Sequence, residues 1–304
     1  MPITKTRKIW MNGELVDWDK AQIHVLTHAL HYGSGVFEGI RCYKTTKGPA
    51  VFRLREHVRR MFDSAKLYYM DMPYKTEEIE GAIKELIKAN RLDACYIRPI
   101  AYRGYGEMGL NPLKSPVDVA IAVWPWGTYL GEDGLKNGIK VMVSSVRRFN
   151  SDVMPTKAKA TGQYINSILA KVQSLKAGYD EAVMLDSRGM VSEGPGENIF
   201  VVRDSVLYTP PEHASLLMGI TRDSVIKIAG SLNHKVMETD IDRGMLYTAD
   251  EAFFTGTAAE VTPIREIDGH AIGKPGPVTL DIQRRFFDIV EGKDQEYGHW
   301  LSYI

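Results

Sequence analysis

A lysine set among small residues stands out in this sequence. Lys159 lies in the segment 155–164, and two further blocks follow it: 192–198, with Glu193 beside glycines, and 255–260, with a Gly/Thr turn. The three blocks supply an amine, a carboxylate and a turn able to hold phosphate. Pyridoxal phosphate needs all three, because a lysine binds its aldehyde, a carboxylate faces its ring nitrogen and hydrogen-bond donors hold its phosphate. The combination predicts a pyridoxal phosphate site.

Each of these groups has a neighbour that could take its place. A lysine with the ordinary pKa of about 10.4 attacks an aldehyde poorly at neutral pH, and the small neighbours of Lys159 would let it pack closely around a cofactor. Lys157, two residues away, stays open as an alternative. Glu193 could keep a ring nitrogen protonated and so make the ring an electron sink, with Glu197 as the local alternative. Asn198 could fix this turn through side-chain to backbone hydrogen bonds.

Groups for the phosphate come from elsewhere in the chain. Residues 219–223 form the end of a loop and the expected start of a helix, where backbone N–H groups favour an anion. Thr257 offers a hydroxyl and, after a glycine, a close backbone approach. Arg60 could complete the pocket with a charge-assisted contact. Arg59 lies next to it, and composition leaves both arginines open.

Composition narrows the class of protein. The 304 residues suffice for one large or two medium domains, and a hydrophobic content of 44% is ample for a core. Lys+Arg and Asp+Glu both number 38, without long runs of one sign, so a small-molecule partner is favoured over nucleic acid or an anionic membrane. The polar N-terminus, residues 1–8, resembles neither a signal peptide nor a membrane span, which predicts a cytoplasmic protein. Cys42 and Cys95 lie far apart in the sequence, which argues against a disulfide framework or a zinc ribbon. Both are expected to be small buried residues. No metal site is predicted.

Periodicity predicts a mixture of strands and helices. Asn12-Gly13, between the apolar runs 9–11 and 14–16, predicts a hairpin with a type I′ turn. Helices are expected over 55–70, 76–90, 164–177, 221–232 and 277–291, and further strands over 96–101, 117–124, 139–145, 181–186, 198–202 and 235–239. Residues 125–131, rich in aromatics and helix breakers, form a candidate interdomain connection. The order of elements predicts two α/β domains, without the regular alternation of a doubly wound sheet.

Several blocks of the sequence together resemble branched-chain amino acid aminotransferases of fold type IV. They occur in the family's order between Ile9 and about Phe287, and comprise 30–33 (Leu-His-Tyr-Gly), 36–41 (Val-Phe-Glu-Gly-Ile-Arg), 96–99 (Tyr-Ile-Arg-Pro), 125–127 (Pro-Trp-Gly), the lysine block, 192–198, 219–222 (Gly-Ile-Thr-Arg) and 256–260. The resemblance implies a two-domain α/β fold. A small N-terminal domain would span 1–124, an interdomain loop 125–133, and a large pseudo-barrel domain that binds pyridoxal 5′-phosphate 134–304. It also implies a homo-oligomer, either a dimer or a dimer-based hexamer.

The same resemblance implies which residues hold the cofactor. It selects Lys159 over Lys157 for the bond to the cofactor aldehyde, and as the base and acid that moves a proton between the substrate Cα and C4′ of the cofactor. Glu193 would contact the ring nitrogen and Tyr164 the ring hydroxyl. The phosphate would be held by Arg60, Ile220, Thr221 and Thr257.

A substrate pocket is implied as well. Its side-chain pocket would be formed by Tyr32, Phe37, Gly39, Trp126 and Tyr129, in which the aromatic residues act as rigid apolar walls. Arg98, helped by Tyr96, would receive the distal carboxylate of glutamate, and the backbone amides of Thr257 and Ala258 would hold the α-carboxylate. The resemblance thus predicts ping-pong transamination between leucine, isoleucine or valine and 2-oxoglutarate.

Three residues depart from the family pattern. Met218 replaces the proline expected before Gly-Ile-Thr-Arg, and Thr161 and Gln163 replace smaller or shorter residues after the lysine. These changes bear on the geometry at the phosphate loop and beside the ring, and leave the reaction class intact. Alternatives of the same fold are a D-amino acid aminotransferase and an aminodeoxychorismate lyase, and a non-catalytic ligand-binding protein is a third. The blocks at 96–99 and 125–131 favour the branched-chain member.

Overall fold

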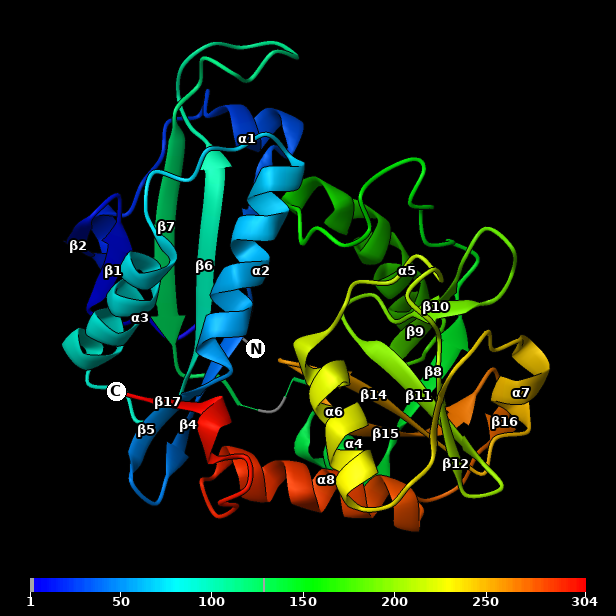
Figure 1. Cartoon of the computed structure of the whole chain (residues 1–304). Helices are drawn as coiled ribbons and strands as arrows, with labels where there is room; N and C mark the ends of the chain where they lie inside the picture. The colour runs from blue at the N-terminus through cyan, green and yellow to red at the C-terminus, as the bar shows by residue number, and fades with distance from the viewer. Residues whose placement is uncertain (1–2, 128) are drawn as a thin grey trace. The chain divides into compact units, whose positions relative to one another are not determined.

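The chain folds into two compact units (Figure 1). The computed structural model describes residues 3–127 and 129–304. The first unit comprises Met1–Trp126, Ala158–Gln163 and Ile289–Ile304, and the second comprises Gly127–Lys157 and Tyr164–Asp288. Residues 1–2 of the polar N-terminus and residue 128 of the candidate interdomain connection lie outside the described part. The division into domains at 124 and 134 stays a prediction.

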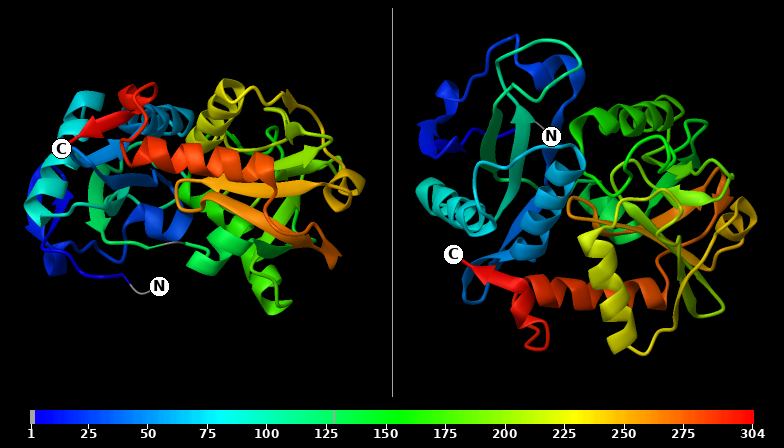
Figure 2. Two further views of the ribbon diagram at one scale, coloured as in Figure 1. Left: turned by 90° about the horizontal axis from the view of Figure 1, so that it is seen from below. Right: turned by 45° about the horizontal axis from the view of Figure 1, so that its top comes forward.

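An antiparallel sheet forms the base of the first unit, with the strand order β17-β5-β4-β6-β7-β1-β2 and with β3 paired to β6. Its strands are β1 (Lys8–Met11), β2 (Glu14–Asp17), β3 (Gly35–Phe37), β4 (Ile40–Thr45), β5 (Gly48–Phe52), β6 (Cys95–Arg103), β7 (Val117–Trp124) and β17 (Leu301–Tyr303). The predicted hairpin is confirmed, since Asn12 and Gly13 join β1 to β2 with φ angles of 48° and 95°. β17, at the red end of the chain in Figure 2, pairs with β5.

Two long helices cover one face of this sheet. α2 (Leu54–Leu67) and α3 (Thr76–Asn90) lie side by side, and the short α1 (His28–Tyr32) precedes β3 (Figure 1). The apolar positions predicted for these helices face the core: Val58, Met61, Ile79 and Ile83 are at most 1% exposed. Burial of each such side chain contributes about 1.5–3 kcal/mol. This packing fixes the face of α2 that is directed at the sheet.

Both cysteines are buried and free, as predicted. Cys42 on β4 and Cys95 on β6 are nevertheless paired in register on neighbouring strands. Their separation in the sequence therefore does not persist in the fold.

The second unit contains a mixed sheet with the strand order β10-β9-β8-β15-β14-β11-β12-β13 and with β16 paired to β15. Its strands are β8 (Ile139–Val143), β9 (Glu181–Leu185), β10 (Val191–Glu193), β11 (Asn198–Arg203), β12 (Val206–Thr209), β13 (Val236–Glu238), β14 (Glu251–Gly256), β15 (Glu260–Ile267) and β16 (His270–Ala271). β8 runs parallel to β9 and β15, and β12 runs parallel to β13. Strands far apart in the sequence are thus neighbours. Glu193 is the last residue of β10, and Thr257 directly follows β14.

Three helices of the second unit, those predicted over 164–177, 221–232 and 277–291, begin and end close to their predicted limits, whereas the short helices over 132–137 and 243–247 were not predicted. The helices of this unit are α4 (Glu132–Asn137), α5 (Tyr164–Lys176), α6 (Ile220–Ser231), α7 (Arg243–Tyr247) and α8 (Pro277–Val290), whose last two residues belong to the first unit. Across residues 3–127 and 129–304, no helix combines the length and apolar composition that crossing a bilayer requires.

Candidate active site

Lys159 is held by its backbone from two sides within the first unit. Its N–H donates to Ser64 Oγ on α2 at 3.0 Å, and its carbonyl accepts from the N–H of Phe37 at the end of β3, also at 3.0 Å. The Nζ atom lies 5.2 Å from the centroid of the Phe37 ring. Lys157 differs, since its side chain is 57% exposed and its Nζ pairs with Glu212 Oε2 at 2.8 Å. The surroundings of the two lysines therefore favour Lys159 for chemistry and Lys157 for the surface.

The two neighbouring arginines differ in the same way. The Arg60 side chain is 13% exposed and pairs with a fully buried carboxylate, Glu38, through Nε at 2.6 Å and Nη2 at 2.8 Å. The Arg59 side chain is 82% exposed, and its Nε is 4.0 Å from Asp63. Arg60 is therefore the arginine whose guanidinium is fixed in the interior of the first unit.

Glu38 and His57 complete this buried cluster, and sequence reasoning assigned neither a role. His57 Nδ1 lies 2.8 Å from Glu38 Oε2. Burial alone would raise the pKa of Glu38, but the charge of Arg60 and hydrogen bonds from His57 and Arg60 hold it well below its usual range. Burial lowers the pKa of His57, against the influence of Glu38. Glu38 is thus ionised, and a neutral His57 donates to it from Nδ1. The signal was present in the block 36–41, which contains Glu38.

Aromatic rings surround Arg98 in the first unit. Its guanidinium carbon is 4.9 Å from the Phe37 ring centroid and 5.3 Å from that of Tyr96, and its Nη2 donates to Tyr96 Oη at 3.4 Å. Trp126 packs edge-on against Tyr96 with ring centroids 4.2 Å apart. The structure thus joins Phe37, Tyr96, Arg98 and Trp126 in one cluster. Tyr32 lies on α1, where its ring is 4.6 Å from that of His28.

Arg98 also lines a cavity of about 420 Å³ in the first unit. Other lining residues include Met11, Ile100 and Ala122, so the walls are largely apolar. Arg98 Nε is buried and has no hydrogen-bond partner among the described residues. A partly exposed cation whose buried Nε has no partner among the described residues, beside apolar walls, suits a molecule that combines a carboxylate with an aliphatic body.

Glu193 is a buried carboxylate of the second unit. Its Oε1 lies 2.8 Å from Arg148 Nε, an ion pair whose N–H is not aligned as a hydrogen bond. Its Oε2 accepts from the backbone N–H of Leu217 at 3.1 Å and from Asn198 Nδ2 at 3.2 Å. Asn198 Nδ2 also donates to the carbonyl of Leu217 at 2.9 Å. Asn198 therefore makes the predicted kind of side-chain to backbone bond, but to the loop before α6 and not to its own turn.

Glu197, the alternative to Glu193, has a raised pKa. Burial and the charge of Glu181 raise the pKa of Glu197 to about 8, despite a hydrogen bond from the Gly196 N–H. A carboxyl with that pKa is mostly neutral at pH 7, whereas a group that holds a protonated ring nitrogen must be ionised. The electrostatics favour Glu193 over Glu197 for that role.

The start of α6 lies directly after Leu217 and Met218. Gly219 is the N-cap, and Ile220 and Thr221 are the first helical residues, whose N–H groups have no acceptor within the helix. A Cβ on Gly219 would overlap Asn198 Oδ1, so the glycine allows this close approach. Arg222, 2% exposed, anchors the helix start by donating to the Pro210 carbonyl and to Glu238 Oε2.

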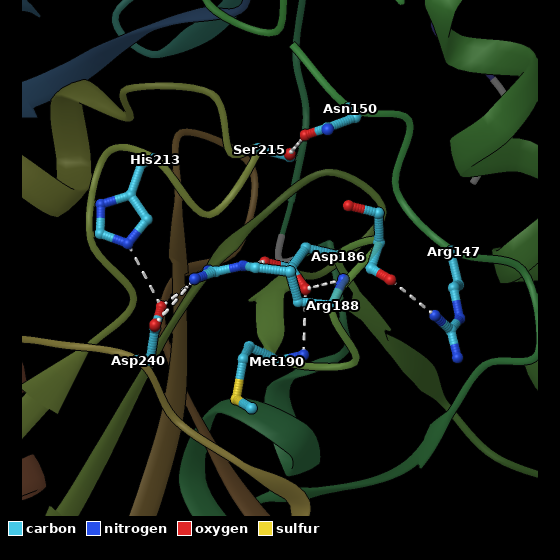
Figure 3. A network of polar contacts seen from close by, with 9 residues as sticks. Arg147, Asn150, Asp186, Arg188, Met190, His213, Ser215 and Asp240 are labelled. Atoms are coloured by element: carbon cyan, nitrogen blue, oxygen red, sulfur yellow. Dashed lines mark hydrogen bonds and ion pairs between the residues drawn. The ribbon is translucent and has the colours of Figure 1, made fainter. Parts of the chain in front are cut away.

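A polar network fixes the β9–β10 turn that precedes Glu193 (Figure 3). Buried Asp186 accepts from the backbone N–H groups of Arg188 and Met190 and from the Arg188 side chain. Arg188 also pairs with Asp240, which His213 approaches at 3.4 Å. Figure 3 further shows the hydrogen bond that Ser215 Oγ donates to Asn150 Oδ1. This bond connects the chain before the lysine block to the loop before α6.

The remaining predicted residues are divided between the units. Gly39 lies in the first, where a Cβ would overlap Tyr96 Oη. Tyr129, Tyr164, Thr257 and Ala258 lie in the second. Tyr164 begins α5, and Tyr129, 37% exposed, has Lys171 Nζ at 5.6 Å from its ring centroid. Thr257 and Ala258 form the half-buried turn between β14 and β15.

Two departures from the family pattern have structural partners in the first unit. Thr161 Oγ1 donates to the carbonyl of Gly33 at 2.7 Å, and Gln163 Nε2 donates to Tyr68 Oη at 2.7 Å. Both side chains therefore hold the segment after Lys159 against the first unit.

Comparisons with known proteins bear on the family and the fold. The model of a family described as Amino-transferase class IV matches residues 35–267. A Pseudomonas aeruginosa protein named branched-chain-amino-acid aminotransferase is 49% identical over 298 residues, which cover 97% of each chain. A crystal structure of the Escherichia coli branched-chain amino acid aminotransferase has a TM-score of 0.96 and 48% identity, and covers 98% of this chain and 99% of its own. That of the Thermobaculum terrenum branched-chain amino acid aminotransferase in its PLP-form has a TM-score of 0.92 and 35% identity, and covers 98% of each chain. The predicted fold class is confirmed.

Proposed function

Since the chain belongs to the class IV aminotransferases, we propose that it transfers the amino group between branched-chain L-amino acids and 2-oxoglutarate, with pyridoxal 5′-phosphate as cofactor. The products are branched-chain 2-oxo acids and L-glutamate. The observation that carries this proposal is the near-complete coverage at 47–49% identity of relatives named branched-chain-amino-acid aminotransferase. The lyase, the D-amino acid enzyme and the binding protein are not favoured.

The donor groups fit the cofactor. In the first unit, the largely buried Arg60 suits a phosphate. In the second unit, the N–H groups of Ile220 and Thr221 at the start of α6 suit a phosphate as well, and Thr257 adds a hydroxyl. Glu193, paired with Arg148, suits the ring nitrogen, and Tyr164 suits the ring hydroxyl. When bound, the cofactor supplies the electron sink that makes the substrate Cα–H acidic. Lys159 binds it covalently in this proposal.

Lys159 also moves the proton. Its Nζ takes the proton that leaves the substrate Cα and later returns it, as base and then acid. The Lys159 N–H donates to Ser64 Oγ and the Lys159 carbonyl accepts from the Phe37 N–H. These bonds support this role, because they limit the positions that the amine can reach. The donor and the acceptor substrate use the same site in turn, which is a ping-pong cycle.

Different residues contact the aliphatic side chain and the carboxylates of the substrates. Phe37, Trp126, Tyr32 and Tyr129, with Gly39, enclose the aliphatic side chain, while the amides of Thr257 and Ala258 hold the α-carboxylate. Arg98, with Tyr96, receives the distal carboxylate of glutamate. The unsatisfied Arg98 Nε supports this assignment, since a carboxylate would satisfy a buried donor.

A half-reaction screen tests the function. Cofactor-loaded protein is mixed with L-leucine, L-isoleucine, L-valine or L-glutamate, with D-alanine as the chiral control, and the cofactor absorbance is followed. The proposal requires conversion by the four L-amino acids and little by D-alanine. Preference for D-alanine, or pyruvate release from aminodeoxychorismate, would assign the chain to another activity of the same fold.

A homo-oligomer in the cytoplasm, a dimer or dimer-based hexamer, is also part of the proposal. α5 supports self-association through an apolar stripe at helical spacing that is 43–61% exposed: Ile165, Ile168, Leu169, Val172 and Leu175. Light scattering after gel filtration tests it. Ile168→Glu should release smaller species and Lys176→Glu, a surface change on the same helix, should not; a monomeric wild type would contradict the proposal.

A further inference from the structure

Glu38 makes contacts that the proposed roles do not use. It is 0% exposed, and its two oxygens receive hydrogen bonds from Arg60 Nε, Arg60 Nη2 and His57 Nδ1. Its own N–H donates to the Pro99 carbonyl on β6 at 2.9 Å. Burying a charge is unfavourable unless it is paired and hydrogen-bonded. Here both carboxylate oxygens are satisfied and the backbone that carries them is fixed.

This carboxylate belongs to a closed ring of contacts that includes Lys159. Phe37, next to Glu38, binds the Lys159 carbonyl, and Ser64 Oγ accepts from the Lys159 N–H. Ser64 lies one turn after Arg60 on α2 and donates to the Arg60 carbonyl at 2.8 Å. The ring therefore runs from Glu38 through Arg60 and Ser64 to Lys159, and returns through Phe37.

We propose that Glu38 is a positioning residue that orients the Arg60 guanidinium toward the phosphate of the cofactor. The inference rests on the proposed function. The guanidinium is planar, so a contact along its Nε and Nη2 edge sets both its plane and the direction of its Nη1 end. His57 holds the carboxylate from a third direction. An arginine oriented before binding loses less conformational freedom when the anion arrives.

The test separates affinity for the phosphate group from affinity for the ring. Dissociation constants for pyridoxal 5′-phosphate and for pyridoxal, which lacks the phosphate, are measured by cofactor absorbance. Their ratio reports the phosphate contribution. In Glu38→Gln this ratio should fall by about tenfold to a hundredfold, the range for a hydrogen bond to a charged group, while the affinity for pyridoxal stays near that of wild type.

Further variants sharpen the comparison. Asp63→Asn, which removes the carboxylate near exposed Arg59 on the same helix, should leave the ratio unchanged. Glu38→Asp keeps the charge and should give a ratio between those of wild type and Glu38→Gln. If Glu38→Gln does not fold, Glu38→Asp provides the test in its place. In an Arg60→Met background, Glu38→Gln should cause no further loss, because the two act on one contact.

Three results would overturn the inference. An unchanged ratio in Glu38→Gln and Glu38→Asp shows that Arg60 needs no orientation by Glu38. An equal loss of affinity for both ligands shows that Glu38 only supports the fold. A wild-type protein that binds pyridoxal as tightly as pyridoxal 5′-phosphate refutes the proposed phosphate contact itself. If the wild type binds pyridoxal 5′-phosphate much more tightly, that contact stands, independently of the result for the Glu38 variants.

Discussion

Replacement of Glu193 by glutamine should have one effect on stability and another on rate. Each carboxylate oxygen faces an N–H group: Oε1 faces Arg148, and Oε2 faces Leu217 and Asn198. The amide oxygen will take the Oε2 side, where two donors lie, so the amide nitrogen will face Arg148. A guanidinium with a side-chain exposure of 7% then loses its counter-charge.

The size of the stability effect follows from that burial. Breaking a buried ion pair by removing one partner costs about 3–5 kcal/mol, because the remaining charge is uncompensated. The Arg148→Met/Glu193→Gln double variant removes both charges and should recover part of the loss. Urea unfolding of the cofactor-free proteins, followed by circular dichroism, measures these differences.

The rate effect has a separate cause. A neutral amide cannot stabilise a protonated ring nitrogen as a carboxylate does, and removal of such an electrostatic group costs about a hundredfold or more in rate. Stopped-flow absorbance of the L-leucine half-reaction measures it, with protein shown to be folded and cofactor-loaded. Near-normal rates in Glu193→Gln would refute the reasoning and move the role to Glu197 or elsewhere.

Three further predictions concern substrate choice and pH. Arg98→Ala should lower kcat/KM for glutamate and 2-oxoglutarate by about tenfold to a hundredfold, because a charge-assisted contact is lost. The value for leucine should change little. An equal loss for leucine and glutamate would mean that Arg98 holds the shared α-carboxylate or supports the fold. Gly39→Ala should displace Tyr96, whose hydroxyl the new Cβ would overlap, and so impair glutamate as well; unaltered kinetics would show that the ring adjusts freely. The pKa of Glu197 is raised to about 8. The contribution of Glu197 to the stability of the folded protein is therefore complete below the usual pKa of a glutamate. As pH rises from there through about 8, this contribution is lost, by up to about 1.4 kcal/mol per pH unit. Glu197→Gln should therefore lose less stability than wild type between pH 5 and pH 9, and parallel unfolding curves for the two would contradict this.

Local signals predicted the elements well where each element carries its own pattern. The Asn12-Gly13 turn and the spaced apolar residues of α2 and α3 depend on neighbours in the chain, and the structure has these elements close to the expected residues. By contrast, pairing of β17 with β5 brings together residues about 250 positions apart. No local pattern encodes such a pairing.

The candidate site shows the same division. Residue types predicted the lysine, the carboxylate and the helix start, but left Lys157, Arg59 and Glu197 as alternatives. Burial and pairing, which are properties of the fold, favour one member of each pair. The partners Glu38 and Arg148 lie 22 and 45 positions from the groups they pair with, Arg60 and Glu193, so spacing gave no reason to connect them.

The site of covalent attachment tests the central claim most directly. Cofactor-loaded protein is reduced with borohydride, digested, and mapped by mass spectrometry for the pyridoxyl adduct, with Lys157→Ala as the matched control. The adduct should lie on Lys159 in both proteins, and Lys159→Ala should form none and lose turnover, because the covalent bond and the proton carrier are lost together. An adduct on Lys157, or turnover that persists in Lys159→Ala, would contradict the account.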